Sequence, residues 1–403
     1  MKTLLMTREF PPHVYGGAGV HVEYLSRELA RLCEVEVRCF GDQHVSGNGI
    51  SVNGFRVPTP DGWDAPAPLQ SVFNTFAHGL EFNGRDIDAD VVHLHTWYSH
   101  FAGVMAKLNY GLPMVLTTHS LEPLRPWKRE QLAGGYDCSL WIEKTAIEMA
   151  DAVVAVSEGT RDDVLRLFDV DPARVHVIYN GIDSEEYQPV ERPEVLRRLG
   201  VREDRPFVLF VGRITRQKGI IHLVNAIRHM DPGFQVVLCA GAPDTPEIAA
   251  EMRAAVDRER AHRDGIVWIA DMLSVPDKVA LYSHARAFCC PSIYEPFGII
   301  NLEAMACGTA VVASRVGGMT EVIVDGETGS LVPLEQQQQS PFEALDPDQF
   351  ARDLAAEINR VMADEALAAR LGEAGRRRAV EVFSWSAIAR QTVDLYARVT
   401  GRD

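Results

Sequence analysis

Residues 207 to 219, FVLFVGRITRQKG, contain the pattern that organises this chain. Five apolar residues, rich in β-branched and aromatic types, precede Gly212 and predict a buried strand. Arg213 and Lys218 follow the strand, and a helical apolar period begins after Gly219. A buried strand that passes through a polar turn into a helix is the repeating unit of a parallel α/β sheet.

Short β-branched runs alternate with helical patterns on both sides of this stretch. A second series of strands begins after the turn signal Asn180-Gly181 and an acidic, Pro-containing segment that ends at Pro206. The expected strands are Thr3–Met6, Val35–Phe40, Val91–His95, Met114–Thr118, Ala152–Val156, Val175–Tyr179, Phe207–Val211, Gln235–Ala240, Ile266–Ala270, Ala287–Pro291 and Thr309–Ala313.

This alternation predicts an α/β protein with two Rossmann-like, doubly wound parallel-sheet domains that face a cleft. Ligands of such sheets bind outside the carboxyl ends of the strands. We expect a first domain at residues 1–188 and a second domain at 189–383. A helix over 384–403 is expected to cross back to the first domain.

Composition limits the classes of partner. The net charge is −16, and residues 1–188 hold 15 Lys and Arg against 26 Asp and Glu, so nucleic acid and anionic membranes are poor partners. No apolar stretch approaches membrane-spanning length, which excludes membrane insertion. The seven cysteines form no Cys-x-x-Cys pair, so neither a zinc site nor a disulfide framework is indicated and a cytoplasmic location fits.

Two segments predict contacts with a phosphorylated sugar donor. Arg213 at a strand end and Lys218 at the next helix start can meet one phosphate and suit a diphosphate that gains charge as it leaves. Residues 294–298, YEPFG, also end a strand and open a helix, where free N–H groups bind phosphate. Glu295 and Glu303 lie at different depths along a bound ligand, and carboxylates suit sugar hydroxyls. The alternatives are a solvated cation cluster, a helix-capping acid and a helix-surface acid.

Residues 11–19, PPHVYGGAG, follow the first strand and precede a helix, so the backbone at Gly16 and Gly17 can approach an anion. The loop lacks the spacing Gly-x-Gly-x-x-Gly, which disfavours a dehydrogenase. A plain tight turn is the alternative.

Histidines at strand ends are the other candidates. His95 and His119 each lie at the carboxyl end of a strand, whereas His93 is expected in the core. No third ligand has an informative spacing, so no metal site is predicted.

Together these segments resemble the retaining glycosyltransferases of GT-B fold, glycosyltransferase family 4. The family signature, Glu followed after seven residues by Glu, corresponds to Glu295 and Glu303, and the resemblance spans nearly the whole chain. It implies catalytic roles for His119, Arg213, Lys218 and Glu295. The donor-binding residues that it implies are Gly16, Gly17, Arg213, Lys218, Glu295, Phe297, Gly298, Ile299 and Glu303. Among them, Glu303 matches the ribose-binding acid of the family. The resemblance also implies that residues 1–188 are the acceptor-side domain and residues 189–383 the nucleotide-sugar-binding domain.

Within the family, residues 7–12, 15–19 and 118–123 look most like the actinobacterial enzymes of glycogen and maltose-1-phosphate synthesis. That similarity implies retaining α-1,4-glucosyl transfer from ADP-glucose, with no cofactor. The acceptor would be α-glucose-1-phosphate or the non-reducing end of an α-glucan. Longer bacterial glycogen synthases carry a Lys where this chain has Val14, so phosphate neutralisation is expected to rest on Arg213 and Lys218.

The acceptor is expected beside residues 125–129, RPWKR, a basic and aromatic cluster just past His119. We hypothesise that His95, Arg125, Trp127, Lys128 and Arg129 bind it. A solvated loop is the alternative.

Other functions remain open at this point. They include a related transferase that uses a UDP- or GDP-sugar and another small or lipid acceptor, a UDP-sugar epimerase, and a catalytically dead glucan-binding protein. The sequence also leaves a homodimer open.

Overall fold

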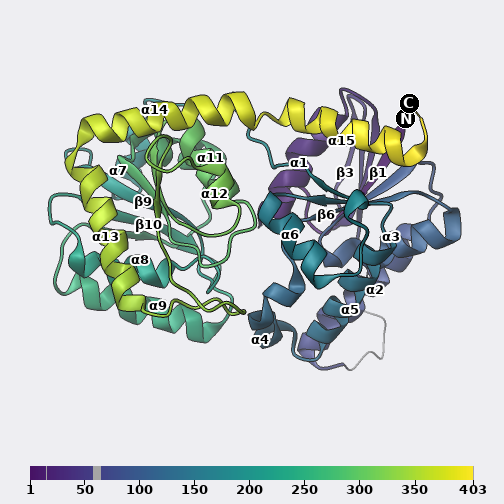
Figure 1. The fold of residues 1–403 in the computed structure, drawn as a ribbon, viewed down its shortest axis with the longest axis horizontal. Helices are drawn as coiled ribbons and strands as arrows, with labels where there is room; N and C mark the ends of the chain where they lie inside the picture. The colour runs from purple at the N-terminus through teal and green to yellow at the C-terminus, as the bar shows by residue number, and fades with distance from the viewer. Residues whose placement is uncertain (15, 58–64, 403) are drawn as a thin grey trace. The chain divides into compact units, whose positions relative to one another are not determined.

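The computed structural model describes residues 1–14, 16–57 and 65–402, and it divides into two compact units. Unit 1 comprises Met1–Gly181 and Trp385–Asp403, and unit 2 comprises Ile182–Ser384. In each unit, helices cover the two faces of a sheet (Figure 1). Tyr15 of the glycine-rich loop lies outside the described residues.

The sheet of unit 1 has the strand order β3-β4-β2-β1-β5-β6-β7-β8, and every neighbouring pair is parallel except β3 with β4. Strands β2 to β4 lie on one side of β1 and strands β5 to β8 on the other, so the switch point of this sheet is between β1 and β5. The strands are β1 (Lys2–Met6), β2 (Glu34–Phe40), β3 (His44–Gly47), β4 (Ile50–Phe55), β5 (Val91–His95), β6 (Met114–Thr118), β7 (Ala152–Ala155) and β8 (Val175–Val177).

The α-helices of unit 1 include the last helix of the chain, α15, which lies beside α1 (Figure 1). The indole of Trp385 at the start of α15 stacks on Tyr24 of α1 with a centroid distance of 6.0 Å. These helices are α1 (Gly17–Leu29), α2 (Ala67–Asn83), α3 (Trp97–Tyr110), α4 (Arg129–Leu132), α5 (Gly135–Met149), α6 (Glu158–Leu167) and α15 (Trp385–Thr400).

The sheet of unit 2 is parallel throughout, with the order β11-β10-β9-β12-β13-β14. The strands are β9 (Phe207–Arg213), β10 (Gln235–Gly241), β11 (Ile266–Ile269), β12 (Ala287–Cys290), β13 (Ala310–Ser314) and β14 (Ser330–Val332). The helices are α7 (Pro193–Arg198), α8 (Ile220–Ala226), α9 (Pro246–Arg260), α10 (Val275–His284), α11 (Ile299–Ala306), α12 (Met319–Val322), α13 (Pro347–Ala363) and α14 (Glu365–Val382).

The central strands of unit 2 are buried from end to end because helices cover both faces of the sheet. Such strands need continuous apolar runs rather than alternating ones, and β9 and β13 have them. The order of this sheet is that of the dinucleotide-binding α/β fold, in which successive strands are added on one side of β9 and then, from β12 onward, on the other side. Ligands of such sheets bind at the carboxyl ends of the strands at this switch point.

The described helices contain no segment that is both long and apolar enough to cross a bilayer. All seven cysteines carry free thiols.

Candidate functional site

The switch point of unit 2 brings two distant sequence segments to neighbouring strand ends. Arg213 is the last residue of β9, and Lys218 lies in the turn before α8. Residues 291–298 follow the adjacent strand β12 and lead into α11. The two cations and Glu295, predicted from separate motifs, therefore lie at one edge of one sheet.

Lys218 and Glu295 contact each other directly. The Nζ of Lys218 donates to Oε2 of Glu295 over 2.6 Å, and the hydroxyl of Ser292 donates to the same oxygen over 3.2 Å. Glu295 is only 6% exposed. Burial alone would lower the pKa of Lys218, but the negative charge of Glu295 raises it above its ordinary value, so the ammonium is charged. A second cationic position comes from Arg213, whose Nη2 donates to Oδ1 of Asp244 over 2.6 Å.

Glycines shape the loop that carries Glu295. Gly298 has φ of 99°, a left-handed conformation that favours glycine, and it caps the amino end of α11. A Cβ at Gly317 or Gly318 would overlap the carbonyl oxygens of Glu295 or Pro296. This close packing of backbone on backbone fixes the position of the carboxylate.

Other predicted donor residues surround that turn. Phe297 is buried, and its ring packs edge-on against Phe383 at a centroid distance of 5.8 Å. This contact anchors the loop in the core of unit 2. Ile299 is half-buried at the first turn of α11. Sequence inspection missed Asn301, which is fully buried and whose amide oxygen and nitrogen have no hydrogen-bond partner among the described residues.

Glu303 is a buried acid held by three donors. The hydroxyls of Tyr187 and Tyr282 donate to its two oxygens over 3.1 and 2.9 Å, and the Nζ of Lys278 lies 3.4 Å from Oε1. Burial, together with the charge of Glu303, holds the pKa of Tyr282 well above its usual value. The alternative of an ordinary surface acid is therefore excluded. Its role toward a ribose stays a prediction.

In unit 1, the glycine-rich loop closes around an acid. The N–H of Gly16 donates to Oε2 of Glu9 over 2.9 Å, and Glu9 is 8% exposed. Gly17 is exposed at the first position of α1. The carboxylate of Glu9 therefore lies where a helix amino terminus attracts negative charge.

Three histidines lie close together at the carboxyl ends of the strands in the sheet of unit 1. Nδ1 of His95 lies 3.1 Å from Nε2 of His119, and the ring of His21 in α1 meets His119 edge-on at a centroid distance of 4.6 Å. Burial lowers the pKa of His21 to about 4 and holds those of His95 and His119 well below their ordinary value, so all three are neutral imidazoles. Sequence spacing gave no sign of His21, because a helix packed on the sheet supplies it.

His93 is a core residue, as predicted. It is 1% exposed, and its two ring nitrogens lie 2.6 Å from the hydroxyl of Tyr396 and 2.7 Å from that of Thr117.

The basic cluster past His119 forms short helical turns, η1 (Glu122–Leu124) and η2 (Pro126–Lys128), that lead into α4. Its cations have protein partners. Arg125 donates to Ser120 (2.9 Å) and to the buried Glu122 (3.4 Å), Lys128 to Gln131 (2.8 Å), and Arg129 to both oxygens of Asp137 (3.0 and 2.6 Å). Trp127 is 7% exposed, so in this conformation it presents little ring surface to a sugar.

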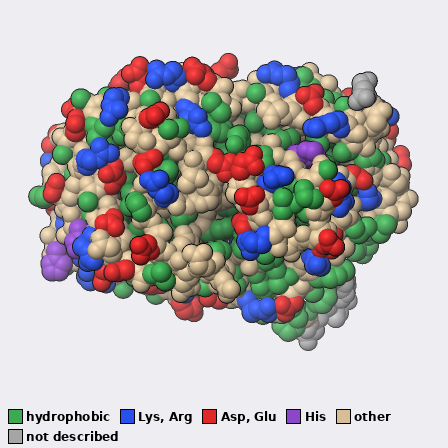
Figure 2. All heavy atoms as spheres, in the orientation of Figure 1, with side chains coloured by type: hydrophobic (Ala, Val, Ile, Leu, Met, Phe, Trp, Pro, Cys, Tyr) green, Lys and Arg blue, Asp and Glu red, His purple; other side chains and the backbone are tan. Residues whose placement is uncertain are grey.

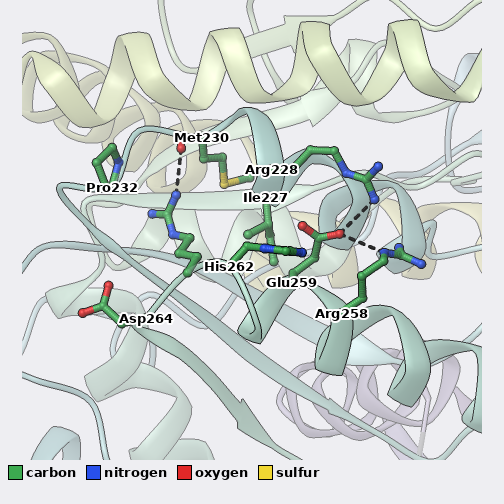
Figure 3. Close-up of a pocket in the computed structure, with 9 residues that line it drawn as sticks. Ile227, Arg228, Met230, Pro232, Arg258, Glu259, His262 and Asp264 are labelled. Carbon is green, nitrogen blue, oxygen red and sulfur yellow. Dashed lines mark hydrogen bonds and ion pairs between the residues drawn. The ribbon is translucent and has the colours of Figure 1, made fainter.

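A hollow of about 420 Å³ lies elsewhere in unit 2, against residues that precede β10 and β11 (Figure 3). In it, Glu259 accepts from Arg228 (2.8 Å) and from Arg258 (3.1 Å), as the dashed lines show. These positions are at the amino ends of the strands, opposite the edge that carries Arg213 and Glu295. The hollow therefore does not coincide with the predicted site.

Surface charge fits the net balance of −16. Acidic and basic side chains are interspersed over the face seen in Figure 2, without an extended basic area.

Comparison with known proteins places these features in a family. The model described as Glycosyltransferase Family 4 matches residues 15–186, and the model described as Glycosyl transferases group 1 matches residues 191–378. The chain is 50% identical over 404 residues to the alpha-maltose-1-phosphate synthase of Mycolicibacterium smegmatis, covering 99% of this chain and 100% of that protein. It is 48% identical over 403 residues to the protein of the same name from Mycobacterium tuberculosis H37Rv, with the same coverage. Among solved structures, sucrose-phosphate synthase from Thermosynechococcus elongatus matches with a TM-score of 0.83 at 25% identity, covering 100% of both chains.

Proposed function

The chain belongs to glycosyltransferase family 4 and has the GT-B fold, and from this membership we propose that it is a retaining α-1,4-glucosyltransferase that moves glucose from ADP-glucose to α-glucose-1-phosphate. The product is α-maltose-1-phosphate, which places the enzyme in α-glucan biosynthesis. The observation that carries the proposal is the 48–50% identity, over essentially the full length, to enzymes named for this product.

The transfer chemistry is supported by the charges at the β9/β12 switch point. Breaking the sugar–phosphate bond adds negative charge to the departing diphosphate, and preorganised cations stabilise that charge. Arg213 offers a planar fork of donors and Lys218 a compact ammonium. We assign both to the diphosphate.

Glu295 provides the counterpart on the sugar. Its Oε2 already accepts from Lys218 and Ser292, and its carboxylate has further acceptor positions for the hydroxyls of a glucose. Movement of the Lys218 ammonium from Glu295 to a phosphate would exchange one charge-assisted hydrogen bond for another.

Retention of configuration follows if the acceptor hydroxyl attacks from the face that the diphosphate leaves. In this scheme a phosphate oxygen takes the acceptor proton, so no protein base is needed. His119, a neutral imidazole, is assigned to the sugar near its anomeric carbon. For the acceptor phosphate we keep the basic cluster at residues 125–129, in which Lys128 is half-buried and donates to the neutral side chain of Gln131.

The test pairs ADP-glucose or UDP-glucose with glucose-1-phosphate or glycogen and analyses the products by mass spectrometry and NMR. We expect ADP and a disaccharide phosphate with an α-1,4 linkage, formed fastest from ADP-glucose. Elongation of glycogen without formation of a disaccharide phosphate would show that the acceptor is an α-glucan and not glucose-1-phosphate. An isomerised or hydrolysed UDP-sugar without acceptor would indicate an epimerase, and binding without turnover would indicate a glucan-binding protein.

A further inference from the structure

We propose that His21, His95 and His119 form a three-histidine binding site for a divalent transition-metal ion of the zinc class. One ring nitrogen from each of these residues lies within 4.8 Å of the others. The three side chains come from helix α1, the end of β5 and the residue after β6, all within unit 1.

The spacing of the nitrogens is close to that of a metal site. Zinc binds imidazole nitrogens at about 2.0–2.1 Å in a tetrahedral arrangement, which separates the ligand nitrogens by roughly 3.3 Å. Nδ1 of His95 and Nε2 of His119 are already 3.1 Å apart. All three ligand nitrogens lie within 4.8 Å of one another, so one ion can bind them after the site contracts.

His21 is oriented as a metal ligand is. Its Nδ1–H donates to Oδ1 of Asn180 over 2.6 Å, which fixes the tautomer and leaves a lone pair on Nε2. Nε2 of His21 is buried and has no hydrogen-bond partner among the described residues. Trp385 packs edge-on against the His21 ring at a centroid distance of 5.2 Å and restricts its rotation. A buried nitrogen without a partner is unfavourable, and a bound ion would satisfy it.

The donor set selects the ion. Three imidazole nitrogens form the donor set, and imidazole is the commonest metal ligand in proteins. The trio contains no carboxylate, so Mg²⁺ and Ca²⁺, which need oxygen ligands, are disfavoured. Zn²⁺, Ni²⁺ and Cu²⁺ are favoured.

Access to the site is through its outermost member. His21 and His95 are buried, whereas His119 is half-buried where β6 ends. With three protein ligands, a fourth position remains for water or for an oxygen of another molecule, as in zinc sites that are open.

A bound ion would occupy a lone pair of His119. This consequence rests on the proposed function, in which His119 meets the transferred glucose. The ion would then inhibit glucosyl transfer, and a chelator would restore it.

The binding test uses the full chain, freed of metal with a chelator, and titrates it with Co²⁺ followed by Zn²⁺. We expect one Co²⁺ per chain, with the intense visible absorption of a four-coordinate ion, and displacement by Zn²⁺. His21→Gln and His119→Gln should each abolish the absorption. Asn180→Ala, which removes only the partner that orients His21, should weaken binding by about 10–100-fold.

The matched control is His222→Gln, which alters a buried histidine of unit 2. It should bind Co²⁺ as the unaltered protein does. Far-UV circular dichroism checks that each variant is folded, and His119→Gln, at a half-buried position, tests the site even if His21→Gln does not fold. Co²⁺ bound with equal affinity by the unaltered protein and by His119→Gln would overturn the proposal, and so would the absence of Co²⁺ binding.

An activity assay with Zn²⁺ separates this proposal from the function. Metal binding without inhibition would leave the site intact and contradict the role of His119. Normal transfer without metal binding would leave the function intact and remove the site.

Discussion

Lys218 and Glu295 form a largely buried ion pair that joins the turn after β9 to the turn after β12, with Nζ and Oε2 separated by 2.6 Å. Their side chains are 22% and 8% exposed, so either charge alone would be poorly solvated. The pair thus holds each group at the strand ends before a donor arrives.

Replacing Lys218 tests the diphosphate role. Lys218→Ala and Arg213→Ala should each reduce kcat by about 10²–10³-fold, or roughly 3 kcal/mol, as loss of one oxyanion donor does. Steady-state kinetics with ADP-glucose and glucose-1-phosphate measure this. Arg202→Ala removes an exposed ion pair with Asp204 and serves as the control with unchanged kcat. Near-normal turnover in both test variants would contradict the assignment.

Tyr282→Phe tests how Glu303 is held. The variant removes the hydroxyl that donates to Oε2 over 2.9 Å, and loss of a hydrogen bond to a charged group costs about 1.5–3 kcal/mol. Urea unfolding should show this loss, together with a higher KM for ADP-glucose if Glu303 meets the ribose. Tyr110→Phe, whose half-exposed hydroxyl bonds a carbonyl in unit 1, is the comparison variant. Unchanged stability in Tyr282→Phe would show that Lys278 and Tyr187 suffice.

The sequence allowed the buried strands to be predicted because parallel strands covered on both faces are continuous β-branched runs. It did not reveal β3, whose residues His44–Gly47 are exposed and carry no apolar pattern. The Asn48-Gly49 dipeptide, with positive φ at both residues, is the hairpin signal that would have indicated it. The three-residue β14 is too short for any period to show.

The site divides in the same way. Arg213, Lys218 and Glu295 could be placed together because strand ends at a switch point must be neighbours. Asp244 and His21 could not be found, because their positions depend on how a loop after β10 and a helix pack, and neither contact leaves a pattern in the sequence.

Buried histidines make the stability of unit 1 depend on pH. Burial lowers the pKa of His21 to about 4 and those of His93 and His100 to about 3, against 6.5 for an ordinary histidine. Below pH 6.5 the unfolded chain binds protons that the folded unit does not. Stability is therefore complete above pH 6.5 and falls as the pH drops toward 4, by about 2 kcal/mol per histidine at pH 5.

Hydrogen exchange of peptides from β5 and β6 at pH 7.5 and pH 5.0 measures this loss. His100→Leu removes one buried titrating ring whose nitrogens have no partner among the described residues. The variant should therefore lose about 2 kcal/mol less stability between pH 7.5 and pH 5.0 than the unaltered protein does. Identical pH dependence in the variant would contradict the assignment of His100.

Lys128→Glu tests the acceptor hypothesis without disturbing a buried acid. Arg125 is unsuitable because it pairs with Glu122, which is 2% exposed. Reversal at Lys128 should raise the KM for glucose-1-phosphate by about tenfold, the equivalent of roughly 1.4 kcal/mol, and leave the KM for ADP-glucose unchanged. Lys144→Glu, at an exposed position on α5 outside the cluster, is the control for general charge effects. Equal acceptor KM values in the unaltered protein and Lys128→Glu would count against the phosphate role.

Gly219→Ala tests whether the backbone beneath Lys218 matters for the donor. Gly219 has φ of 60°, and a Cβ there would overlap the carbonyl oxygen of Pro291, in the turn that leads to Glu295. The left-handed conformation alone costs an alanine about 1–2 kcal/mol, and the overlap must push the two turns apart. We therefore expect lower stability and a lower kcat/KM for ADP-glucose. Gly233→Ala, where a Cβ meets open space, should change stability by less than about 0.5 kcal/mol. If the two variants behaved alike in urea unfolding and in kinetics, the close approach of these turns would have no part in placing Lys218 against Glu295.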